Sequence, residues 1–211
     1  VRSSTFNVSS DIRPSDTLHA PRSTPHAQRL FLHSTGGSTG VPVRFYMTRE
    51  SYEWRTAVSD RGYSWAGAEE GRRVVMVSGA PAVELSPFAR IKGRIHSRLQ
   101  GRTVVDSFIF DAQRKRACCE LINSIRPHAI VGYTGNLVEL AMFVRDNPGA
   151  LTWTAPAVVT AAEGLREGQR QLIERRLGKE VFLSYGSREF MLIGMECPAH
   201  SGYHISSDNL F

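Results

Sequence analysis

The residues best suited to chemistry in this chain lie in the segment 34–42, which reads Ser-Thr-Gly-Gly-Ser-Thr-Gly-Val-Pro. Glycines reach positive φ and expose successive backbone N–H groups, while Ser and Thr hydroxyls donate to phosphate oxygens without adding bulk. The segment therefore has the chemistry of a phosphate cradle. It is not the P-loop of kinases, because that motif needs a Lys followed by Ser or Thr, and here the chain continues with Val41 and Pro42.

The alternative interpretation of this segment is a solvated turn, since clusters of Ser, Thr and Gly between apolar runs are ordinary loops. The flanking residues favour the phosphate site, because 30–32 and 43–47 both read as short strands. A glycine-rich turn between two strands differs from the strand-to-helix turn of a mononucleotide-binding fold. We therefore expect a different nucleotide-binding family.

Size and composition are those of a globular protein. The chain has 211 residues with 41% apolar content, which suits one large domain or a generous part of a bigger one. Apolar runs fall short of the ~20 residues that a membrane-spanning helix needs, so we expect a cytoplasmic protein without membrane contact. Two of the three cysteines, Cys118 and Cys119, are adjacent and recur at helical spacing with apolar residues, which predicts reduced, structural thiols.

The net charge of +6 raises the question of a nucleic-acid partner. The densest basic cluster, 114–116, falls on a predicted helix without interleaved aromatic residues that could stack bases, so we favour a solvated helix face. The same positive charge can attract an anionic nucleotide and coenzyme.

The ends of the chain suggest two expectations about domain organisation. Residues 1–29 contain prolines, Ser and Thr without periodicity, which predicts a poorly ordered lead-in before a core at 30–211. The chain begins with Val1 and stops at Phe211 in what reads as the opening of a strand, so we expect an internal segment of a longer protein.

Strand and helix patterns alternate along the core, which predicts an α/β fold with mostly parallel sheets covered by helices. The expected strands are 73–77, 104–108, 129–132, 157–160 and 181–183, and the expected helices are 48–67, one capped by Asp111, one over 137–144, and one over 165–177 ended by Gly178. Ligands in such sheets bind beyond the carboxyl ends of strands. The loops expected there are 78–79, 132–133, 160–164 and 185–189.

These loops match, in order, motifs of a known superfamily. Residues 35–42 are similar to its phosphate loop [ST]-[SG]-G-[ST]-T-G-K-P, 160–165 to its Gly-Glu-x-Leu turn, and 185–189 to its Tyr-Gly-x-[ST]-E motif. The chain thus resembles the adenylate-forming (AMP-binding) enzymes from about Phe31 to Phe211. Gly132-Tyr133 is similar to the Gly-Tyr-x-Ser segment of these enzymes, and Glu196-Cys197 with 203–205 resembles specifically the phenylacetate-CoA ligase group within them.

The resemblance implies that a carboxylic acid reacts with ATP to give an acyl-adenylate, and that coenzyme A then forms a thioester. AMP is the leaving group that a carboxylate otherwise lacks. The matched region is the core of the large N-terminal domain, and the resemblance places the ribose-binding Asp and the mobile C-terminal domain with its catalytic lysine beyond Phe211. The 211 residues alone are therefore expected to be incompetent for turnover.

Residue roles follow from the resemblance only where motifs match. Glu189 would be catalytic and bind Mg²⁺, a hard cation suited to carboxylate. Read alone, Tyr185 is an ordinary strand-end tyrosine and Glu189 a solvated carboxylate, so the roles depend on the order of the motifs. The implied phosphate site is Thr35, Gly36, Gly37, Ser38, Thr39 and Gly40; the AMP site is Glu163, Gly164, Tyr185, Gly186 and Ser187; and the acyl pocket is Ser78, Gly79 and Tyr133.

The chain departs from the family pattern at two matched positions. Val41 stands where the phosphate loop usually has Lys, which removes a cation from the γ-phosphate side, and Arg188 stands where Ser or Thr is usual, so that it could take over the missing charge.

Cys197, His200 and His204 have ligand types and a spacing that could hold Zn²⁺. We favour a structural role, because three ligands lack an obvious fourth in the sequence. Two further alternatives stay open: a degenerate nucleotide-binding module without catalysis, and a basic nucleic-acid-binding protein. The sequence identifies neither the acid nor the oligomeric state, and a homodimer is one option.

Overall fold

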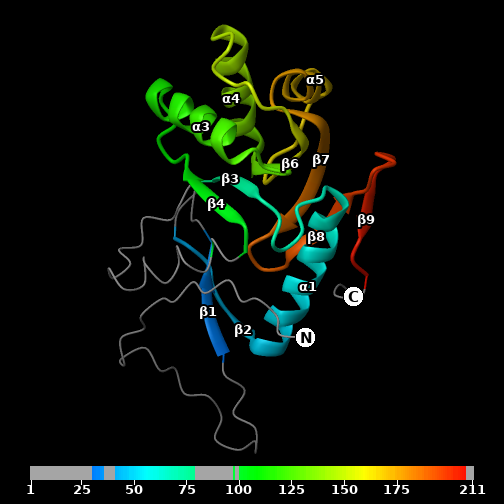
Figure 1. The fold of residues 1–211 in the computed structure, drawn as a ribbon. Coiled ribbons are helices and arrows are strands. Elements are labelled where there is room, and N and C mark those ends of the chain that lie inside the picture. The colour runs from blue at the N-terminus through cyan, green and yellow to red at the C-terminus, as the bar shows by residue number, and fades with distance from the viewer. Residues whose placement is uncertain (1–29, 36–40, 79–96, 98–99, 208–211) are drawn as a thin grey trace, which may run out of the picture.

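The computed structural model describes residues 30–35, 41–78, 97 and 100–207 (Figure 1). The predicted lead-in 1–29, the loop residues Gly36 to Gly40, and Gly79 lie outside the described residues.

A hairpin precedes the main sheet. Strands β1 (Leu30–Ser34) and β2 (Arg44–Thr48) pair antiparallel, with Leu30 opposite Thr48, so the Ser/Thr/Gly segment connects two paired strands. Helix α1 (Arg49–Trp65) follows at once, and its N-cap is Thr48, whose hydroxyl accepts a hydrogen bond from the N–H of Ser51. The predicted strands and helix cap are confirmed.

The main sheet has seven strands among the described residues, in the order β4-β3-β5-β6-β7-β8-β9. The pairings from β4 to β7 are parallel, and those of β7 with β8 and β8 with β9 are antiparallel. The mostly parallel α/β architecture is confirmed. The strands are β3 (Val74–Ser78), β4 (Arg102–Asp106), β5 (Ala129–Tyr133), β6 (Ala155–Ala161), β7 (Gly178–Ser187), β8 (Met191–Glu196) and β9 (Tyr203–Ile205).

Helices cover both faces of this sheet (Figure 1). α3 (Ala112–Ile125), α4 (Thr134–Asp146) and α5 (Glu167–Arg176) pack on one face, and α1 packs on the other. Successive side chains of a strand point to opposite faces of the sheet, so the core has two parts. Ile130 of β5 packs with α3 and α4, and Val131 packs with α1. Asp111 caps α3 through the N–H of Arg114, as predicted.

Two predicted boundaries are wrong. β4 starts and ends two residues before the predicted strand. Phe108 and Ile109, which follow it, are 80% and 60% exposed, so these apolar residues do not belong to a buried strand. Gly178 is the first residue of β7 instead of a helix end, and Leu177 is the C-cap. A Cβ on Gly178 would lie 2.5 Å from Cγ2 of Val158, so this glycine permits close strand packing.

The antiparallel end of the sheet was not predicted. β7 runs through Tyr185 to Ser187 and turns back into β8, so that the segment expected at a parallel strand end forms the connection of a hairpin. β9 adds to β8 as a three-residue strand whose residues are all exposed.

Cys118 and Cys119 are buried between α3 and the sheet, which confirms their structural interpretation. Burial raises the pKa of the Cys118 thiol to about 12 and that of Cys119 to about 11, because the thiolate is poorly solvated there. In the described part of the chain, none of the helices has the length and apolar character needed to cross a bilayer.

Candidate functional site

A cleft of about 440 Å³ opens between α1, the β1–β2 hairpin and the sheet, and it extends from the first residues of β3 and β4 to the carboxyl ends of β5 and β6. Its apolar lining comes from segments far apart in sequence, among them Met47 of β2, Met76 of β3 and Val131 of β5. Ser184, Gly186 and further residues of the β7–β8 hairpin form another wall. The cleft can hold a small organic ligand at the place where parallel α/β sheets commonly bind one.

One part of the cleft is polar. Arg102 of β4 lies with its Nη2 3.4 Å from Oδ1 of Asp60 on α1. Burial raises the pKa of the Asp60 carboxyl, and the charge of Arg102 opposes this rise. Burial likewise raises the pKa of Tyr63, against the effect of a hydrogen bond with Ser184. A ligand in the cleft therefore meets both apolar surface and a charged pair.

The Ser/Thr/Gly segment is closed at its base. The N–H of Thr35 donates to the carbonyl of Val43 at 3.0 Å, and the N–H of Val43 donates to Oγ1 of Thr35, also at 3.0 Å. The two ends of the segment are thus held together, and the Thr35 hydroxyl proton is left to donate elsewhere.

His33 stands next to this closure and lines the cleft. Its ring stacks with Phe45 at a centroid distance of 5.7 Å and with Tyr52 at 6.2 Å. Burial lowers the pKa of His33, and the positive charges of Arg188 and Arg55 lower it further. This end of the cleft therefore has a positive electrostatic potential.

The connection between β7 and β8 reaches the same place. Nε of Arg188 lies 3.4 Å from the carbonyl oxygen of Ser34, across 154 positions of sequence. Arg55 of α1 donates from Nη1 to the carbonyl of Glu189, and its guanidinium lies over the Phe190 ring at 5.3 Å. The structure thus brings the motif 185–189 beside the base of the Ser/Thr/Gly segment.

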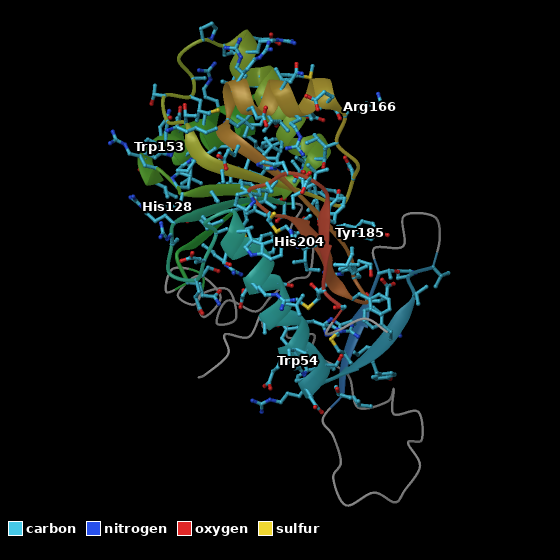
Figure 2. The ribbon with its side chains drawn as sticks, turned by 90° about the vertical axis from the view of Figure 1, so that its right-hand side faces the viewer. Trp54, His128, Trp153, Arg166, Tyr185 and His204 are labelled. Carbon is cyan, nitrogen blue, oxygen red and sulfur yellow. The ribbon has the colours of Figure 1, made fainter. Side chains whose placement is uncertain are left out.

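Tyr185 faces away from the cleft. Ser184 lines the cleft whereas Tyr185 does not, as expected from the alternation of side chains along a strand. The register with β8 shifts between Tyr185 and Gly186, and Gly186 and Ser187 both line the cleft. The ring of Tyr185 is 57% exposed and packs against Tyr203 of β9 at 6.2 Å (Figure 2). A flat ring with this exposure can stack a base.

Glu189 keeps an ionised carboxylate. Its pKa is lowered first by a hydrogen bond from its own backbone N–H and then by one from the hydroxyl of Ser187. An ionised, accessible carboxylate is the ligand type that a hard divalent cation prefers.

Glu163 is bound to the start of α4. Its Oε2 accepts from the N–H of Gly135 at 2.9 Å, and its carbonyl accepts from Oγ1 of Thr134, also at 2.9 Å. The carboxylate therefore lies at the N-terminus of α4, where the helix dipole stabilises it. Ala162, with a φ of 70°, turns the chain so that it lines the cleft.

The remaining predicted residues divide between the cleft and its surroundings. Tyr133 lines the cleft, and Ser187 lines it beside Arg188. Ser78 ends β3 and accepts from the N–H of Ser107, but it is not among the described lining residues, and neither is Gly164.

Cys197, His200 and His204 do not converge. Nε2 of His204 lies 3.1 Å from Sγ of Cys197, and its ring meets Trp65 edge-on at 5.1 Å. His200 turns to Glu196, at 3.4 Å, and packs on Phe182. Among the described residues, no three His, Cys, Asp or Glu side chains are grouped so that they could hold a metal ion.

The basic cluster on α3 is engaged locally. Lys115 pairs with Glu139 at 2.7 Å, Arg116 lies over Phe143, and Arg114 donates to the carbonyl of Ile109 at 3.0 Å. These contacts agree with a helix surface and give no row of free cations for a nucleic-acid backbone.

Several cleft residues were not predicted from the sequence. His33 directly precedes the Ser/Thr/Gly segment, and that position could have identified it. Asp60 and Arg102 meet across 42 positions, and neither has a local sequence signal.

Comparisons with known proteins identify the fold. No family model matches the chain. Protein CapK of Staphylococcus aureus is 25% identical over 166 residues, which are 79% of this chain and 37% of CapK. A structure of 2-hydroxyisobutyryl-CoA ligase in complex with 2-HIB-AMP and CoA superposes with a TM-score of 0.57 at 16% identity, over 85% of this chain and 42% of the ligase.

VinN superposes with a TM-score of 0.53 at 16% identity, over 80% of this chain and 39% of VinN. The fold of this chain is therefore that of part of these two solved structures, one of which is a CoA ligase in complex with 2-HIB-AMP and CoA. The chain spans about two fifths of the length of these proteins.

Proposed function

We propose that this chain carries the nucleotide-binding core of an acid-CoA ligase, which converts a carboxylic acid and ATP to an acyl-adenylate and then passes the acyl group to coenzyme A. The observation that carries the proposal is the contact of Arg188 with Ser34, because it joins the 185–189 motif to the base of the Ser/Thr/Gly segment beside the cleft. The shared fold with CoA ligases supports it.

In the proposed complex the two substrates lie on opposite sides of β7. The base of ATP stacks on the exposed ring of Tyr185, and the acid enters the cleft lined by Gly186. The triphosphate passes over the connection that follows Ser187, toward Thr35. The carboxylate and the α-phosphorus then meet at this connection.

The reaction balances without a redox step. A carboxylate oxygen attacks the α-phosphorus of ATP, and the bond to the bridging oxygen breaks to release pyrophosphate. The thiol of coenzyme A loses its proton to solvent, its sulfur attacks the acyl carbon, and AMP leaves with the bonding electron pair. Positioning and charge neutralisation supply most of the catalysis in such phosphorus chemistry.

Glu189 fits the Mg²⁺ that accompanies ATP, because hydrogen bonds from its own N–H and from Ser187 keep it ionised. When bound, Mg²⁺ neutralises charge on the phosphate oxygens. Glu163 would order the wall of the cleft at Ala162 through its hydrogen bond with the N–H of Gly135 at the start of α4.

The acid is of an aryl or acyl type, as in the phenylacetate-CoA ligase group. This part of the proposal rests on the motif resemblance and on the apolar lining at Met47, Met76 and Val131.

Binding and turnover measured separately test the proposal. Calorimetry should show that this protein binds ATP with Mg²⁺ and that Tyr185→Ala weakens both ATP and AMP about tenfold, since stacking of a base contributes about 1–3 kcal/mol. Pyrophosphate exchange with a panel of aryl and acyl acids then tests adenylation in the protein that carries this core. Nucleotide binding without exchange for any acid would favour the degenerate binding module.

A further inference from the structure

Compared with the family pattern, the Ser/Thr/Gly segment lacks a lysine at Val41, and the connection after β7 has an additional arginine at Arg188. Val41 is 93% exposed at the position where the resemblance expects Lys, so an apolar side chain faces solvent beside a phosphate site. Arg188 is exposed as well and stands where a neutral hydroxyl is expected. Arg188 contacts Ser34 at the start of the segment. The hydrogen bonds between Thr35 and Val43 hold that start against the residue two positions after Val41.

Arg188 has N–H donors that can bind a ligand. A guanidinium carries five N–H donors, and the contact of its Nε with the Ser34 carbonyl is long, at 3.4 Å. Within the ranges that the structure describes, no carboxylate forms an ion pair with Arg188. Its side chain lines the cleft next to His33. Four donors and a full charge are therefore directed to no described acceptor.

Arg55 holds the connection that carries Arg188. It donates to the carbonyl of Glu189, and its guanidinium packs over Phe190. Both arginines also lower the pKa of His33, so the three basic groups share one small region. An anion at this point would relieve the repulsion between the cations.

We infer that Arg188 binds the β- and γ-phosphates of the nucleotide in place of the lysine that Val41 replaces, and that Arg55 is the residue that positions the connection carrying Arg188. The inference rests on the proposed function and deepens it. A bidentate guanidinium suits phosphate oxygens at least as well as an ammonium group.

The test compares ATP with AMP, because AMP lacks the β- and γ-phosphates. Isothermal titration calorimetry measures both nucleotides with the unmodified protein, Arg188→Ser, Val41→Lys and the double variant, with Arg175→Ser on α5 as a matched exposed-arginine control. We expect Arg188→Ser to weaken ATP at least about tenfold and AMP less than about threefold, as for loss of one charge-assisted contact.

Val41→Lys should restore most of the ATP affinity in the Arg188→Ser background and add little to the unmodified protein, because both cations serve the same phosphates. Thermal melting checks that each variant is folded. Equal loss of ATP and AMP affinity, unchanged ATP affinity, or no rescue by Val41→Lys in folded variants would overturn the inference and leave the proposed function standing. An unmodified protein that binds neither nucleotide would instead overturn the proposed function.

Discussion

Glu196 on β8 forms a buried ion pair close to β7, and the effect of removing its charge on the free energy of unfolding can be worked out from its contacts. Its carboxylate accepts from Nη2 of Arg170 at 2.9 Å to each oxygen and from the N–H of Leu183 at 3.0 Å. The side chains of Glu196 and Arg170 are 9% and 19% exposed. The pair therefore links α5, β7 and β8 in a place that water barely reaches.

Glu196→Ala would leave the Arg170 cation without this partner, and breaking a buried pair costs about 3–5 kcal/mol. Arg170 keeps a 2.6 Å bond to the carbonyl of Val181 and some contact with water, so we expect the lower end of that range. A loss of about 3 kcal/mol corresponds to a fall of about 6–12 °C in Tm for a chain of this size. Glu196→Gln keeps an acceptor for Leu183 and should lose about 1–2 kcal/mol.

Urea unfolding followed by circular dichroism measures these differences. Asp146→Asn is the matched control, because the Arg145–Asp146 pair is 47% and 58% exposed and its loss should cost less than about 1 kcal/mol. Replacing both Arg170 and Glu196 by Met should recover most of the stability, since no charge is then left buried. If Glu196→Ala unfolded as the control does, this carboxylate would not be what holds β7 to β8.

Two further predictions follow from single positions. Gly132→Ala should cost about 1–3 kcal/mol of unfolding free energy, because its Cβ would lie 2.6 Å from the carbonyl of Val77 on β3, whereas Gly168→Ala on α5 meets nothing within 4 Å and should be neutral or slightly stabilising; urea unfolding of both variants checks this. The pKa of His33, read by NMR titration, should lie below 6.5 and rise in Arg188→Ser. In the unmodified protein the unfolded chain binds a proton at His33 more readily than the folded chain does, so this contribution to stability is lost as pH falls from 6.5 through the folded pKa. If the pKa of His33 were the same in Arg188→Ser, the positive potential inferred here would be contradicted.

Local signals predicted the parallel part of the fold well. Thr48 and Asp111 cap their helices through hydrogen bonds to residues three positions ahead, a distance that the sequence displays directly. The buried β5 strand reads as an apolar run because both of its faces are covered. These features depend on neighbours in sequence, which is why they could be predicted.

The antiparallel end depends on distant partners and could not be predicted in this way. β9 is exposed at all three positions, so no alternation of apolar and polar residues marks it as a strand. The pair of Asp60 with Arg102 and the contact of Arg188 with Ser34 join residues 42 and 154 positions apart. The hydrogen bond of Glu163 with the N–H of Gly135, which holds its carboxylate at the N-terminus of α4, likewise joins residues 28 positions apart.

The pleat of β7 explains how one short motif could serve two substrates. Side chains alternate along a strand, so Tyr185 packs against Tyr203 of β9 while Ser184 lines the cleft. After the register shift that follows Tyr185, Gly186 and Ser187 both line the cleft. Gly186 also lies against β8, since a Cβ there would be 2.0 Å from the carbonyl of Met191. A side chain at Gly186 would separate the two strands and shift the connection that follows. In the proposed reaction the base and the acid approach from opposite faces of β7, so the reacting atoms meet where the strand ends, next to the contact of Arg188 with Ser34.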